Sequence, residues 1–141
     1  MRLWLVGACV PMFALACDAA AQTSVHDSTT TKAGVYSREQ AARGQDVYAN
    51  SCRSCHTPET HAGAAFEKWN DRPLSDLYAF IRDAMPRNAP GSLSAQEYAD
   101  VLAYLLRMNR MPAGSRELSV DSIPMKTIRI STRKLSVRKD P

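Results

Sequence analysis

The chain has 141 residues, a length that favours one domain with a modest hydrophobic core. Its formal net charge is +4, and residues 113–141 carry that excess, with seven basic and three acidic side chains. The apolar run from Leu3 to Cys17 is too short to cross a bilayer comfortably, so it does not predict a membrane span.

Residues 1–21 have the features of a secretory signal peptide. The apolar run follows one positive residue, and Ala19 to Ala21 supply the small side chains that a signal peptidase needs. We therefore expect cleavage near Ala21 and export to the periplasm. A second interpretation stays open, because the residues before Cys17 partly resemble a lipid-attachment box. A single lipid at Cys17 would anchor the protein only weakly.

The next segment, residues 22–35, is predicted to be a flexible Ser/Thr-rich tether. It has almost no large apolar side chain and shows neither a helical nor a strand period. A globular domain is predicted for residues 36–112, followed by a basic C-terminal extension over residues 113–141.

The first helix of this domain is expected to begin after Ser37, which forms a capping-box pattern with Gln40. Helical spacing continues up to Cys52. Gly44, Tyr48 and Cys52 are spaced four residues apart and therefore share one face. A glycine inside a helix costs about 1 kcal/mol relative to alanine, so Gly44 predicts close packing by a second helix.

The motif Cys-x-x-Cys-His, at Cys52, Cys55 and His56, is the mark of covalent haem attachment. The two thiols can each form a thioether with a haem vinyl group, and the imidazole can then ligate the iron. A thiol redox pair normally follows a strand, and no strand pattern precedes this motif. A structural zinc site needs four ligands, and the other cysteines, Cys9 and Cys17, lie in the leader. Haem is the favoured interpretation, with zinc or thiol redox chemistry as alternatives.

Two later segments also have the apolar spacing of helices. The first runs from Leu74 to Ala84. The second begins at a capping box formed by Ser94 and Glu97 and continues through Met108, after which Pro112 stops it.

Three motifs carry a resemblance to a known family: Gly44-x-x-x-Tyr48-x-x-x-Cys52-x-x-Cys55-His56, Met85-Pro86, and Val101-Leu102-Ala103-Tyr104-Leu105. In this order they resemble the class I c-type cytochromes, over about residues 36–112. The resemblance implies an all-α fold in which the N- and C-terminal helices cross around one covalently bound haem c. In that family the residues matching Gly44 and Tyr48 contact those matching Val101 and Tyr104.

Met85 is predicted to be the sixth iron ligand. It stands where a helix gives way to a loop, and it resembles the distal methionine of class I cytochromes. The chain between His56 and Met85 is long enough to pass from one face of the haem to the other. His61 follows His56 too closely for this, and we expect it at the surface. Met108 is expected to fill the core.

Trp69 and Arg72 are predicted to bind the haem propionates, the first through its indole N–H and the second as a bidentate guanidinium. For Arg72 the alternative is a solvated surface charge. A His/Met pair fills both axial positions, so such a site moves single electrons and needs no substrate pocket. No catalytic residues are predicted, and the expected protein is a carrier rather than an enzyme.

Within this family, the segment from Trp69 to Gly114 resembles in particular the cytochromes that accept electrons from periplasmic dehydrogenases. The expected partners are therefore redox proteins: a periplasmic dehydrogenase, a terminal oxidase or another cytochrome, and not nucleic acid. The basic extension could dock on an acidic partner or a membrane, or be a disordered solubilising tail. Two other classes stay open: a haem enzyme or gas sensor with a labile Met85, and the haem subunit of a larger oxidoreductase.

Overall fold

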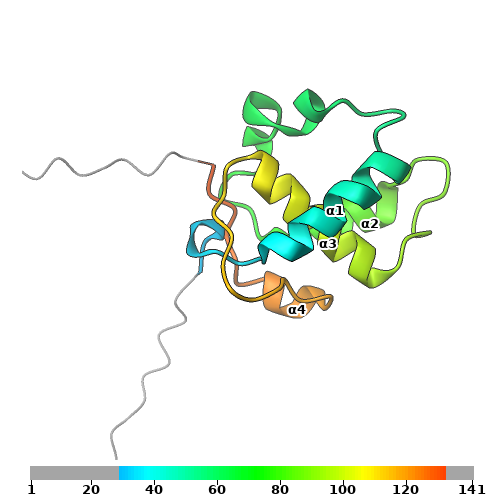
Figure 1. The fold of residues 1–141 in the computed structure, drawn as a ribbon. Coiled ribbons are helices and arrows are strands. Elements are labelled where there is room, and N and C mark those ends of the chain that lie inside the picture. Colours follow the sequence, from blue (N-terminus) through cyan, green and yellow to red (C-terminus); the bar gives the residue numbers. More distant parts are fainter. Residues whose placement is uncertain (1–28, 133–141) are drawn as a thin grey trace, which may run out of the picture.

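The computed structural model describes residues 29–132 (Figure 1). The predicted signal peptide and the first half of the predicted tether lie outside the described residues. All regular structure from residue 29 to residue 132 is helical, accompanied only by isolated β-bridges at Arg129. This confirms the predicted all-α class. None of the described helices is long and apolar enough to span a membrane.

Helix α1 (Arg38–Ser51) begins at the predicted N-cap, where the Ser37 hydroxyl accepts a hydrogen bond from the amide of Gln40 at 3.0 Å. The Gln40 side chain does not complete the capping box. It turns inward and pairs with the main chain of Leu118, donating to the carbonyl at 3.0 Å and accepting from the amide at 2.7 Å. A residue expected to cap a helix thus attaches the C-terminal extension to the core.

The other two long helices match the sequence patterns. Helix α2 spans Leu74–Ala84 and buries Leu77 and Ile81 among others. Helix α3 spans Ala95–Met108 and begins with a complete capping box, in which Ser94 and Glu97 each bond the other's amide. Its buried stripe supplies much of the hydrophobic core.

Helices α1 and α3 pack directly against each other (Figure 1), and Gly44 allows this close approach. A β-carbon at Gly44 would overlap the carbonyl oxygen of Asp100 and stand 3.0 Å from the β-carbon of Tyr104. Beside this contact, Arg43 forms a bidentate ion pair with the buried carboxylate of Asp100, at 2.9 and 3.1 Å. The close packing predicted from Gly44 is confirmed.

The chain on either side of the predicted domain differs from expectation. Residues 29–35 were predicted to be a flexible tether, but Thr31 is fully buried and begins a 3-10 helix, Thr31–Ala33. Residues 113–132 were treated as an extension beyond the core, but Leu118, Met125 and Ile130 are all buried in it, and Met125 ends helix α4 (Ser122–Met125). These apolar residues have no regular period in the sequence, yet all three belong to the same buried cluster as the helix residues.

The two flanking segments meet at one edge of the molecule (Figure 1). The amide of Thr31 donates to the carbonyl of Arg129 at 2.9 Å. On its other side, the extension holds the turn before α2, since the amide of Asp71 donates to Ile130 and that of Leu74 donates to Ile128, each at 2.8 Å. The described part of the extension is therefore packed on the core and is not a disordered tail. Its docking on an acidic partner or a membrane stays a prediction, and residues 133–141 lie outside the described residues.

Candidate functional site

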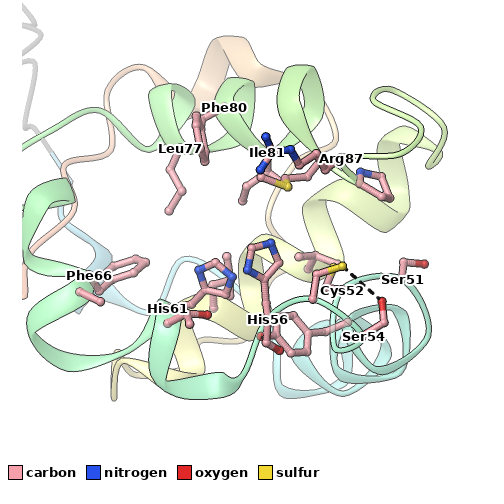
Figure 2. Close-up of a pocket in the computed structure, with 18 of the residues that line it drawn as sticks. Ser51, Cys52, Ser54, His56, His61, Phe66, Leu77, Phe80, Ile81 and Arg87 are labelled. Atoms are coloured by element: carbon pink, nitrogen blue, oxygen red, sulfur yellow. Dashed lines mark hydrogen bonds between the residues drawn. The ribbon is translucent and has the colours of Figure 1, made fainter.

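A cavity of about 680 Å³ lies between α2 and the loop that follows α1 (Figure 2). Its volume is within the range of sites that hold cofactors and other small molecules. Apolar and aromatic side chains form most of the wall: Tyr48, Ala65, Phe66, Trp69, Leu77, Phe80, Ile81, Met85, Pro86, Val101 and Leu105. A wall of this kind suits a flat apolar group and excludes water from its centre.

The Cys-x-x-Cys-His motif lies at one wall of this cavity. Helix α1 ends at Ser51, and the chain turns tightly, with the amides of Cys55 and His56 donating to the carbonyl of Cys52 at 3.1 and 3.0 Å. Cys52 is half-buried and Cys55 exposed, and both thiols are free. All three motif side chains therefore line the same cavity, which is the arrangement that haem attachment requires.

Tyr48 fixes the turn that carries His56. Its hydroxyl donates to the carbonyl of His56 at 3.1 Å and lies 3.3 Å from that of Thr57. Burial raises the pKa of Tyr48, so the hydroxyl stays protonated and can donate at neutral pH. The sequence placed Tyr48 on the packing face of α1 but did not reveal this second role.

His61 is not the surface residue that we expected. It is half-buried, lines the cavity, and stands on the same wall as His56, with the ring centroids 4.7 Å apart (Figure 2). Burial is the main cause that lowers the pKa of His61, with His56 and Lys68 adding to the effect. Its position on this wall agrees with the expectation that His61 does not reach the opposite face.

Met85 also lines the cavity and is the C-cap of α2. Figure 2 shows Ile81, four residues before it, and Arg87, two residues after it, across the cavity from His56. Among the methionines that the structure describes, Met85 alone lines this cavity. Met108 is half-buried against the core, as expected.

Trp69 and Arg72 lie close together but differ in their relation to the cavity. Trp69 is buried and lines the cavity, whereas Arg72 is absent from the lining. The Arg72 guanidinium lies 4.8 Å from the Trp69 ring centroid and pairs with Asp76 at 2.9 Å. In this structure Arg72 pairs with Asp76, four residues further on, and does not line the cavity, so its role at the haem propionates stays a prediction.

Two other cations line the cavity instead, and both are exposed: Lys68 and Arg87. Sequence reasoning missed them. The sequence offered one signal for each: Lys68 adjoins Trp69, and Arg87 closely follows Met85. Neither neighbour alone indicates a cation at the cavity. Their ammonium and guanidinium groups are suited to bind the carboxylates of a haem group, whose porphyrin ring would lie against the apolar wall.

The donor set of this one cavity fits haem c: two free thiols, an imidazole, a thioether, apolar walls and two cations. This site and the all-α fold define a c-type cytochrome with covalently bound haem c. Residues 39–105 match the family model described as cytochrome C oxidase, cbb3-type, subunit III, which supports the same class. Neither the curated proteins nor the solved structures include a significant match to the chain. The protein is therefore a haem c electron-transfer protein, and its partners are other redox proteins.

Proposed function

We propose that this chain is an exported monohaem cytochrome that carries single electrons between periplasmic redox partners. In this proposal Cys52 and Cys55 attach the haem, and His56 and Met85 are its axial ligands. The observation that supports the proposal is that His56 and Met85 line one cavity, to which no other described methionine contributes.

The residues of the cavity explain why this site would transfer electrons rather than transform a substrate. Haem iron, when bound, supplies a one-electron couple whose potential rises with a soft thioether ligand. With His56 and Met85 both engaged, the site has no open position for a substrate. The apolar wall would keep water away from the haem, while Lys68 and Arg87 would hold its carboxylates.

The role of Met85 can be tested by optical and redox titration of Met85→Ala beside wild type. Met108→Ala is the matched control, because Met108 is half-buried but does not line the cavity. We expect Met85→Ala to change the visible spectrum, lower the potential and bind carbon monoxide readily in the reduced form. Met108→Ala should keep the spectrum and potential of wild type. Identical spectra and potentials for Met85→Ala and wild type would exclude Met85 as a ligand.

The electron donor that we propose is a periplasmic dehydrogenase, and the acceptor is a terminal oxidase or another cytochrome. The resemblance over residues 69–114 and the predicted signal peptide support this proposal. Exposed cations near the motif and cavity, Arg53, Lys68 and Arg87, would steer the protein toward an acidic partner. Reduction by the cognate dehydrogenase should then slow as ionic strength rises. Replacing Lys68 and Arg87 with glutamine should weaken that dependence, and rates independent of salt would contradict the proposal.

The family match favours a second candidate, because its description names a subunit of an oxidase. In that case the chain would be the haem subunit of a larger oxidoreductase complex. Purification of the tagged protein from its own membranes and soluble fraction distinguishes the two. A carrier elutes alone and is reduced and oxidised by separate proteins, whereas a subunit elutes with fixed partners in constant ratio.

A further inference from the structure

The Tyr98 hydroxyl joins the two ends of the loop that connects α2 to α3. It donates a hydrogen bond to the carbonyl of Met85 at 2.8 Å. It also accepts a longer one from the amide of Leu93 at 3.4 Å. One side chain therefore contacts the main chain at both ends of this loop, at Met85 and at Leu93.

Tyr98 is well placed to act as a fixed point. Its side chain is buried, and it lies in the first turn of α3, directly after the Ser94 and Glu97 capping box. Its ring packs edge to face against Tyr78 of α2, with the ring centroids 6.5 Å apart. Because both the helix start and the ring are held, the position of the hydroxyl is set by the core and not by the loop.

Both polar groups of the Met85 main chain are anchored by this arrangement. The amide of Met85 donates to the carbonyl of Ile81 at 3.0 Å, which ties it to α2. The carbonyl accepts from Tyr98, which ties it to α3. Met85 itself has left the helix for extended backbone, at φ −132° and ψ 149°. Without the Tyr98 bond, only the amide of this residue would be held.

We propose that Tyr98 is a positioning residue that keeps Met85 facing the cavity and so keeps the distal axial position closed. The inference rests on the proposed function, in which Met85 is the distal ligand. Tyr98 does not line the cavity, and it acts through the main chain of Met85. The bond opposes release of the loop, because opening the distal side would leave the Met85 carbonyl and the buried hydroxyl without each other.

Imidazole is a suitable probe, since it binds ferric haem only when the methionine has moved away. The apparent affinity for imidazole is the intrinsic affinity multiplied by the fraction of open protein. A neutral hydrogen bond of this kind shifts such an equilibrium between about twofold and tenfold. Tyr98→Phe should therefore bind imidazole tighter by that factor, and the limiting rate of binding at high imidazole should rise.

Tyr78→Phe is the matched control. It removes the same atom from the neighbouring ring, whose hydroxyl donates to the carbonyl of Val120 at 3.3 Å and not to the Met85 segment. Titration of ferric wild type, Tyr98→Phe, Tyr78→Phe and Met85→Ala, followed by absorbance, gives the comparison. We expect tighter imidazole binding in Tyr98→Phe and Met85→Ala, and wild-type binding in Tyr78→Phe.

The two ways of failing are distinguishable. If Met85→Ala binds imidazole as wild type does, Met85 is not the ligand, and both the proposed function and the inference are overturned. If Met85→Ala binds tighter while Tyr98→Phe equals wild type, only the inference is overturned. Equal tightening in Tyr98→Phe and Tyr78→Phe would also overturn it, because the effect would then follow general loosening of the core.

Discussion

Gly44 in α1 lies directly against the main-chain carbonyl of Asp100 in α3, with no room for a β-carbon between them. This contact sets how closely the two helices approach. It also places Tyr48, one turn after Gly44, against Tyr104, with their ring centroids 5.3 Å apart. The helix that ends in the haem motif is thereby fixed on the rest of the core.

Replacing Gly44 with alanine should destabilise the protein. Helix propensity alone would raise stability by about 1 kcal/mol, but the new methyl group would force α1 and α3 apart. We expect a net loss of about 1–3 kcal/mol, the usual cost of overpacking. Denaturant unfolding of the haem-loaded protein measures it. Unchanged or greater stability would show that the two helices do not pack as closely as described.

Helix α4 should contribute to stability through Met125 alone. Met125 is fully buried, whereas Ile123 in the same short helix is 65% exposed. We expect Met125→Ala to cost about 2–5 kcal/mol, because it leaves a cavity. Ile123→Ala should change stability by about 0.5 kcal/mol or less. Thermal unfolding of both variants checks this, and equal midpoints would contradict the packing of residues 113–132 on the core.

The capping box of α3 should make stability depend on acid pH. Hydrogen bonds from the amide and hydroxyl of Ser94 lower the pKa of Glu97 below its usual value of 4.5. Because the folded-state pKa is depressed, this contribution is present above pH 4.5 and is lost as pH falls through the lowered value. Unfolding free energy below about pH 4.5 should therefore fall more steeply in wild type than in Glu97→Gln. If unfolding free energy falls equally with pH in the two proteins, Glu97 does not contribute to the acid dependence of stability.

Asn109 should hold the loop that carries His61. Its side chain donates to the carbonyl of His61 at 2.8 Å and accepts from the amide of Gly63 at 3.1 Å. We expect Asn109→Ala to lose about 1–2 kcal/mol of stability and to speed hydrogen exchange at the Gly63 amide. Asn50→Ala, at an exposed position outside the cavity, is the control. Equal hydrogen exchange at the Gly63 amide in both variants would show that Asn109 does not hold this loop.

The helices were predictable because their signals are local. Ser37, Ser94 and the apolar spacing of α2 and α3 each depend on residues within a few positions of one another. The same is true of the Cys-x-x-Cys-His motif, whose three side chains do line one cavity. Their roles in binding haem stay predictions for the experiments above.

The extension and the cavity cations were not predictable in this way. The sequence nominated Arg72 for the propionates, and only the structure shows that Arg72 pairs with Asp76 while Lys68 and Arg87 line the cavity. Likewise, Leu118 and Ile130 belong to no helical or strand pattern in the sequence. Only their burial in the folded chain makes them part of the core.

Sequence alone determined the helical class, the starts of the long helices, the haem motif and the nomination of Met85. Each depends on residues that lie close together in the chain. Tertiary structure alone decided that His56 and Met85 line one cavity, that Tyr98 bonds the Met85 main chain, and that residues 113–132 complete the core. These relationships join residues far apart in the chain. They arise from packing, burial and hydrogen-bond satisfaction, which no local pattern encodes.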